Sequence, residues 1–150
     1  MFKKLFAALA ILISAFSLTG CAPDSSPAPE VVTTPKTGIF IESAWISATD
    51  DSGSSYVYAN ITNRLNGTIT LVGGSTDSGA EAIVTKNIDG KEVLVTDGVD
   101  IHVGETLELS ENKKHLTITK LSKPITPGDK VLFTFKLNGT DSQTVTITAK

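Results

Sequence analysis

The stretch KVLFTFKLNGTDSQTVTIT, residues 130–148, decides the fold class of this 150-residue chain. Its two halves, residues 130–136 and 143–148, largely alternate apolar with polar side chains. This is the period-two pattern of strands that bury one face. Asn138 and Gly139 lie between the halves and are typical turn residues. The stretch therefore predicts a β-hairpin at the end of the chain.

The same alternation recurs upstream and predicts further short strands at residues 39–47, 56–62, 68–72, 82–85, 92–96, 106–110 and 115–119. Gly73 and Gly74 are expected to end the third of these strands, and residues 100–104 are expected to form a loop. No segment beyond the N-terminal region has a helical apolar stripe. The sequence therefore predicts an all-β protein, an antiparallel sandwich or barrel.

Aromatic residues fall on alternating positions of the predicted strands, which predicts that most of them pack in the core. They are Trp45, Tyr56, Tyr58, Phe133 and Phe135. Because side chains two residues apart in a strand point the same way, Tyr56 and Tyr58 are expected to share one face.

The N-terminus has the order of a bacterial lipoprotein signal. Two lysines precede an apolar run at residues 5–18, and the small residues Thr19 and Gly20 lead to Cys21, the only cysteine. This resembles a lipobox, so residues 1–20 are predicted to be a cleaved signal peptide and Cys21 to carry lipid. The protein is then anchored to the cell membrane on its extracytoplasmic side. One alternative is a transmembrane helix, for which the apolar run is short. The other is a secretory signal without lipid, which would leave Cys21 as a free thiol with no second cysteine to pair with.

Composition limits the remaining possibilities. Residues 22–38 read APDSSPAPEVVTTPKTG, so residues 21–38 are predicted to be a disordered tether and residues 39–150 the single folded domain. Without the two lysines of the signal the chain has 11 basic and 16 acidic residues, a net charge of −5. This acidity and the lack of a basic run argue against nucleic acid as a partner. No catalytic motif is present, and we expect no enzyme.

Three stretches together resemble the PCu(A)C family of extracytoplasmic copper chaperones. They are IESAWISAT at residues 41–49, SYVYANITN at 55–63, and LSKPITPGD at 121–129, which is followed by the strand VLFTF at 131–135. The resemblance spans essentially residues 39–150 and implies a cupredoxin-like antiparallel β-sandwich. It also implies that the protein delivers copper to an extracytoplasmic membrane protein, such as a subunit of a terminal oxidase.

The residues that the resemblance assigns to copper are mostly replaced. Family members bind copper through a His and a Met on central strands and a later His-x-Met pair, and thioether sulfur suits Cu(I). Here the first His falls near Thr85, the first Met within residues 93–95, and the pair on His115 and Thr117. Only His115 survives, because the single methionine is Met1.

Two hypotheses follow. In the first, a metal site is rebuilt around His115, together with His102 and a carboxylate, which would suit Cu(II) or Zn(II) rather than Cu(I). In the second, the sandwich is a degenerate binding or assembly module without metal. The alternative for His115 is an exposed residue at a strand start, where Lys113 and Lys114 would oppose metal binding. The alternative for His102 is an ordinary polar loop.

Overall fold

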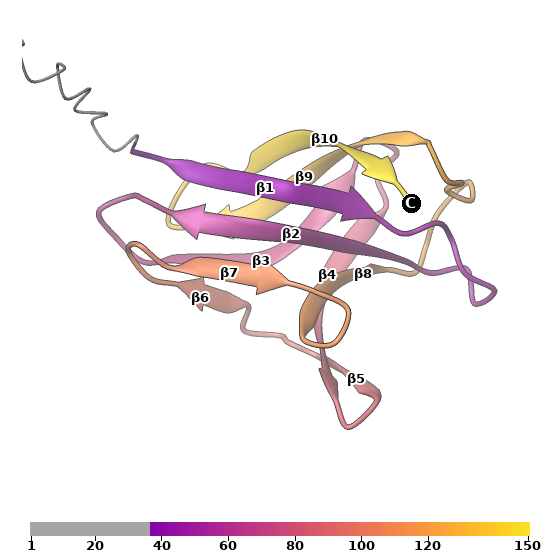
Figure 1. Ribbon diagram of the computed structural model, residues 1–150, viewed down its shortest axis with the longest axis horizontal. Coiled ribbons are helices and arrows are strands. Elements are labelled where there is room, and N and C mark those ends of the chain that lie inside the picture. Colours follow the sequence, from indigo (N-terminus) through magenta and orange to yellow (C-terminus); the bar gives the residue numbers. More distant parts are fainter. Residues whose placement is uncertain (1–36) are drawn as a thin grey trace, which may run out of the picture. The chain divides into compact units, whose positions relative to one another are not determined.

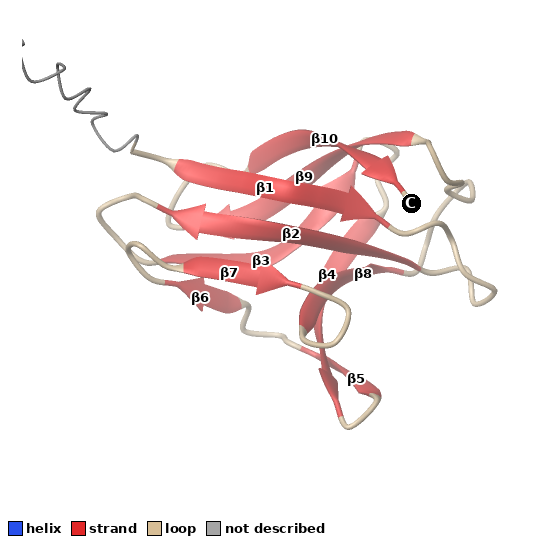
Figure 2. Ribbon diagram, viewed as in Figure 1, coloured by secondary structure: helices blue, strands red, loops and turns tan. Residues whose placement is uncertain are grey.

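The computed structural model describes residues 37–150, which form ten strands and no helix. The strands are β1 (Ile39–Ile46), β2 (Ser55–Asn63), β3 (Ile69–Thr76), β4 (Glu81–Ile88), β5 (Lys91–Leu94), β6 (Val99–Ile101), β7 (Thr106–Leu109), β8 (Lys114–Ile118), β9 (Lys130–Asn138) and β10 (Gln143–Ala149) (Figures 1 and 2). The predicted all-β class is confirmed. The predicted signal peptide and Cys21 lie outside the described residues, as does nearly all of the predicted tether.

No helix within residues 37–150 has the length and apolar character needed to cross a membrane.

The strands form one sheet that closes on itself. Their order is β5-β4-β8-β7-β2-β1-β10-β9-β3-β6, and additional β4–β3 and β8–β2 pairings join its two halves. Most neighbours are antiparallel, as predicted, but β1 pairs with β10 in parallel and β7 touches β8 in parallel. The predicted antiparallel sandwich is therefore a mixed one, because the first and last strands of the domain lie side by side (Figure 1).

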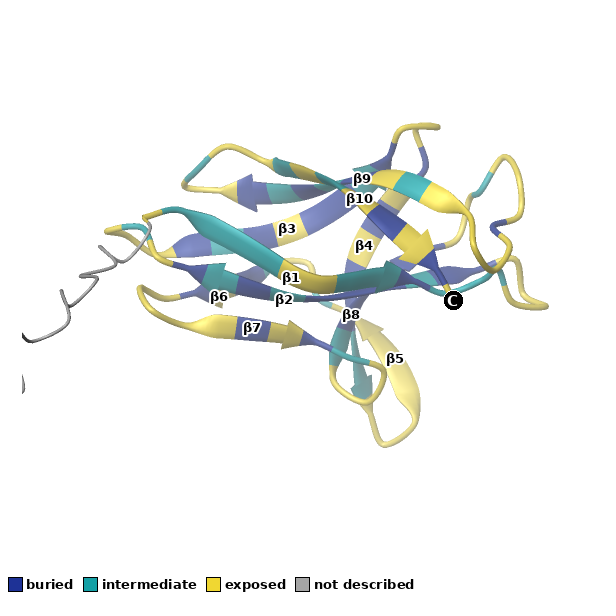
Figure 3. Ribbon diagram, turned by 45° about the horizontal axis from the view of Figure 1, so that its top comes forward, coloured by how far each residue is buried: buried dark blue, intermediate teal, exposed yellow. Residues whose placement is uncertain are grey.

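The core lies between the facing strands, which bury alternate side chains (Figure 3). Its largest fully buried members include Phe133, Phe135, Ile46, Ile61 and Leu116. The rings of Phe133 and Phe135 meet edge to face, with centroids 4.9 Å apart. Burying each such side chain stabilises the fold by about 1.5–3 kcal/mol, so packing holds this domain together.

The prediction that Gly73 and Gly74 end a strand is wrong. Strand β3 continues through both glycines to Thr76, with a register shift against β9 between Leu71 and Gly73. A Cβ on Gly73 would lie 2.7 Å from the carbonyl oxygen of Ala82, and one on Gly74 would overlap the ring of Phe133. The glycines are therefore present because neighbouring groups approach the backbone closely.

Strand β6 is a second difference from the sequence prediction. Residues 99–101 pair with β3, Ile101 opposite Ile69, where a loop was expected to begin at residue 100. The buried side chains of Val99 and Ile101 explain the pairing, since they place this short segment against the core.

The β4–β5 hairpin extends beyond the closed sheet (Figure 1). It turns at Asp89 and Gly90, both of which have positive φ angles, as tight two-residue hairpin turns require. Strand β5 has only four residues, all exposed, and it pairs only with β4 among the described strands. This hairpin forms one wall of the candidate site.

Candidate functional site

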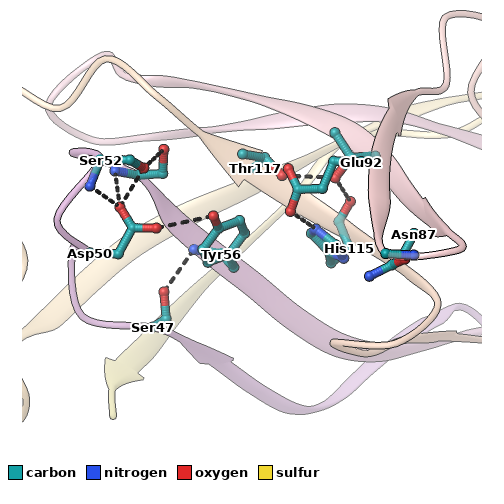
Figure 4. Close-up of polar contacts among 11 residues, drawn as sticks. Ser47, Asp50, Ser52, Tyr56, Asn87, Glu92, His115 and Thr117 are labelled. Atoms are coloured by element: carbon teal, nitrogen blue, oxygen red, sulfur yellow. Dashed lines mark hydrogen bonds and ion pairs between the residues drawn. The ribbon is translucent and has the colours of Figure 1, made fainter.

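His115 lies on β8, between β2 and β4. Its side chain is buried, and the residue is only 2% exposed, so the alternative of an exposed strand-start histidine is wrong. The rings of Tyr56 and Tyr58 cover the imidazole, with centroids 5.4 and 6.0 Å away. The two tyrosines therefore share one face, as predicted, and Figure 4 shows Tyr56 beside His115.

Glu92 of β5 holds the imidazole from the other side. Its Oε1 lies 3.0 Å from Nε2 of His115 (Figure 4). A carboxylate only accepts hydrogen bonds, so Nε2 carries the proton and donates it. The other ring nitrogen, Nδ1, is buried and has no hydrogen-bond partner among the described residues. In this tautomer Nδ1 presents an unpaired lone pair, which is an uncommon state for a buried polar atom.

A pocket of about 230 Å³ opens beside the imidazole. It is lined by Tyr56, Tyr58, Asn87, Glu92, Glu111 and His115. Burial, helped by the nearby charge of Glu111, raises the pKa of Tyr58 to about 12. Burial likewise raises the pKa of Tyr56. Both phenols are therefore protonated at neutral pH, and the ionic donors of the pocket are one imidazole and two carboxylates.

Tyr56 is also held from the side opposite the pocket. Its hydroxyl donates to Oδ2 of Asp50 at 3.1 Å, in the turn that follows β1 (Figure 4). The other oxygen of Asp50 accepts from the Ser52 hydroxyl and from the backbone of Ser52 and Ser54. These bonds, first that from the Ser52 hydroxyl, lower the pKa of Asp50. The turn therefore orients one wall of the pocket.

The positions at which the resemblance places copper ligands do converge here. Thr85 lies opposite His115 in the β4–β8 pairing and opposite Leu94 in the β4–β5 pairing. The hydroxyls of Thr85 and Thr117 are 2.7 Å apart and buried. Since residues 37–150 contain no methionine or cysteine, the soft donors that suit Cu(I) are not among them. Hydroxyl and aliphatic groups occupy those positions instead.

His102 has different neighbours. It is exposed just after β6, where its Nδ1 lies 3.1 Å from the Thr68 hydroxyl and its backbone N–H donates to Glu105. Within the described part of the chain, no cluster of three or more His, Cys, Asp or Glu side chains is arranged to hold a metal ion. A metal role for either histidine stays a prediction.

Three further residues of the pocket were not among the site residues predicted from the sequence, namely Asn87, Glu92 and Glu111. Glu92 pairs with Asn87 across the hairpin and reaches His115 because β4 runs between β5 and β8. The residues Asn87-Ile-Asp-Gly90 are typical of a hairpin turn, and this is the signal that could have found Glu92, because a hairpin with that turn places Glu92 opposite Asn87. Nothing local in the sequence indicated that Glu111 lines the same pocket.

Comparison with known proteins identifies the fold. Residues 39–149 match the model of the LpqE-like family of lipoproteins. The copper-bound PCuAC domain from PmoF2 is similar with a TM-score of 0.61 and 16% identity, over 77% of this chain and 95% of that one. The apo PCuAC domain from PmoF1 is similar with a TM-score of 0.63 and 15% identity, over 77% and 96%.

The solution structure of apo-DR1885 from Deinococcus radiodurans is similar with a TM-score of 0.53 and 22% identity, over 77% of this chain and 80% of that one. No protein of curated function matches the chain. At these identities the likeness concerns the fold alone, and it confirms the predicted resemblance to PCu(A)C domains.

Proposed function

This chain belongs to the LpqE-like family of lipoproteins, and from that premise we propose that it is a membrane-anchored, extracytoplasmic protein of the copper-chaperone type. In this proposal Cys21 carries the lipid, and the pocket at His115 binds copper as cargo. The recipient is an extracytoplasmic membrane protein, such as a subunit of a terminal oxidase. The protein performs no enzymatic step of its own.

One observation carries the proposal. The buried His115 imidazole is held by Glu92 beside an open pocket, at the place where the resemblance locates copper ligands. Imidazole with carboxylate is a donor set that suits Cu(II), whereas the donors typical of Cu(I) sites are lacking in residues 37–150. The expected cargo is therefore Cu(II), bound by Nε2 of His115 and the carboxylate of Glu92 in place of the hydrogen bond between them, with the imidazole proton moving from Nε2 to Nδ1.

The geometry also supports release of such a cargo. Glu92 lies on a four-residue edge strand, and its side chain is 41% exposed, while His115 is fixed within the sheet. A site with two donors leaves coordination positions open to the ligands of a recipient. Exchange can then begin while His115 still holds the ion.

The second candidate is a binding or assembly module without metal. Its support is the buried pair Thr85 and Thr117, at two positions where the resemblance places copper ligands. Their hydroxyls hydrogen-bond each other, so neither needs a metal ion as a partner. Leu94 adds an aliphatic side chain at a third position. On this hypothesis the pocket contributes to recognition of a protein partner.

A titration with Cu(II) under a competing chelator separates the candidates. The sample is residues 21–150 with Cys21→Ser, which removes the lipid, and Cu(I) is titrated in parallel. We expect one Cu(II) ion, with nitrogen and oxygen coordination in its electron paramagnetic resonance spectrum. His115→Ala should abolish this binding, whereas the matched variant of the exposed histidine, His102→Ala, should retain it.

Binding of the parent no tighter than that of the His102→Ala/His115→Ala double variant would contradict the copper proposal. Circular dichroism of each variant establishes that the sheet is intact. In that case the second candidate stands, and the search turns to a protein partner.

A further inference from the structure

The β4–β5 hairpin has two unlike faces. Residues that pair across antiparallel strands point to the same side, as do residues two apart in one strand. Glu92 and Leu94 therefore lie on the face of the hairpin that carries the pocket, and Glu92 lines the pocket itself. The opposite side is here called the lysine face, and it consists of Lys86, Ile88, Lys91, Val93 and Lys114. In the β4–β5 pairing Lys86 lies opposite Val93 and Ile88 opposite Lys91, and in the β4–β8 pairing Lys114 lies opposite Lys86.

The lysine face combines cations with exposed apolar side chains. Ile88 and Val93 are 43% and 42% exposed, although both are branched aliphatic residues. None of Lys86, Lys91 and Lys114 forms an ion pair with any residue in the described range 37–150. The two acidic residues of the hairpin do not lie on the lysine face. Asp89 is in the turn, and Glu92 points to His115 on the opposite face.

We propose that the lysine face docks on the surface of an anionic lipid bilayer. The inference rests on one part of the proposed function, the lipid anchor at Cys21, and not on copper binding. Lysines beside an anionic surface attract it, while branched aliphatic side chains between them enter the boundary between headgroups and acyl chains. The mature chain is acidic overall, with a net charge of −5, so this local cationic face would select one orientation of the domain.

The length of chain before the domain favours a bilayer over a protein as the occupant. The residues between Cys21 and Gly38 span at most about 60 Å when fully extended. A domain of this size has a radius of gyration of about 13 Å, so any of its faces can reach the bilayer and none can move far away. Three lysines give the domain an affinity of its own for an anionic surface, and anchoring of this kind adds to that affinity by raising the effective concentration of the surface.

Docking in this way has a consequence for the pocket. The lysine face and the pocket lie on opposite sides of the same hairpin. With the lysine face on the bilayer, the opening beside His115 points away from the lipid. The pocket is then accessible to a recipient that projects from the same membrane.

Vesicle cosedimentation tests the proposal. The protein is residues 21–150 with Cys21→Ser, so that no lipid contributes. The vesicles are phosphatidylcholine alone, or phosphatidylcholine and phosphatidylglycerol in equal amounts. Each lysine near an anionic surface is worth roughly fivefold in binding, so Lys86→Gln/Lys91→Gln/Lys114→Gln should weaken binding to the anionic vesicles roughly 100-fold.

The matched control is Lys120→Gln/Lys123→Gln/Lys130→Gln, which removes the same charge from three exposed lysines outside the hairpin. It should retain nearly all binding, and added salt should weaken binding of the parent. Ile88→Thr/Val93→Thr should weaken binding while keeping strand-forming residues.

Equal loss in the two lysine variants would overturn the proposal, as would binding to phosphatidylcholine that equals binding to the anionic vesicles. Failure here is distinct from failure of the copper proposal. The lysine-face variant should still bind Cu(II), and His115→Ala should still bind the vesicles.

Discussion

The Nε2 atom of His115 lies 3.0 Å from Oε1 of Glu92, although the two residues are 23 positions apart in the chain. Strand β4 makes this contact possible, because it pairs with β5 through one edge and with β8 through the other. The bond joins a fixed strand of the closed sheet to an exposed edge strand. It defines the pocket in which the proposed chemistry takes place.

Removal of the Glu92 carboxylate should affect both stability and metal binding. In Glu92→Ala neither ring nitrogen of His115 keeps a protein partner, which should lower the free energy of unfolding by about 1–2 kcal/mol, measured by urea denaturation. Cu(II) affinity should fall by more than the roughly 10- to 100-fold that is typical when a group supporting a metal ligand is removed, because Glu92 is itself one of the two proposed ligands. Glu111→Ala is the control, since Glu111 lines the same pocket without bonding His115. A larger loss in Glu111→Ala would contradict the role given to Glu92.

A thioether placed at residue 94 should restore affinity for Cu(I). Leu94 is 58% exposed on the pocket face and lies opposite Thr85, so Leu94→Met conserves volume and brings sulfur toward His115. We expect Cu(I) to bind at least about tenfold more tightly, a gain of about 1.4 kcal/mol, in a competitive titration. Val93→Met places the same group on the lysine face and should change nothing. Equal gains in both variants would refute the pocket assignment.

The Thr85 and Thr117 hydroxyls should be strongly coupled. Each single Thr→Val substitution leaves the other buried hydroxyl without this 2.7 Å bond, at an expected cost of about 1–3 kcal/mol. The double variant removes both polar groups and should cost little more than one single variant. A double-mutant cycle of unfolding free energies measures the coupling. Simple additivity would show that the pair contributes no interaction of its own.

Substitution of Gly74 should destabilise the fold through steric overlap alone. A Cβ at this position meets the ring of Phe133 and lies 2.9 Å from the carbonyl oxygen of Thr134. Gly74→Ala should therefore lower the unfolding free energy by about 1–3 kcal/mol. Gly67 has open space where its Cβ would be, so Gly67→Ala should change stability by less than about 0.5 kcal/mol. Similar losses from the two variants in thermal unfolding would contradict the close approach.

Tyr58 should make stability depend on alkaline pH. Burial raises its pKa from 10.0 to about 12 in the folded protein, so the unfolded chain loses this proton first as pH rises. The stabilisation is complete below about pH 10 and is lost as pH rises through about 12. Ultraviolet absorbance of tyrosinate should show a late transition that Tyr58→Phe removes. A single transition near pH 10 in the folded protein would disprove the shift.

Most strands could be predicted because alternation of apolar side chains is a local property. The predictions were wrong for segments whose conformation is set by residues distant in the sequence. Gly73 and Gly74 signal a break on their own, yet strand β3 needs them because Ala82 and Phe133 approach its backbone. The segment Val99–Ile101 is too short to show an alternation of apolar and polar residues. It pairs with β3 because the side chains of Val99 and Ile101 are buried against the core.

The sequence by itself determined the all-β class, the resemblance to PCu(A)C domains, and the prediction of a lipid on Cys21. It also determined that the described domain contains no sulfur ligand, since that follows from residue types alone. Only the tertiary structure decided that His115 is buried, that Glu92 holds it, and that His102 has other neighbours. The physical reason is that these relationships depend on cross-strand register between distant segments, which no local pattern encodes.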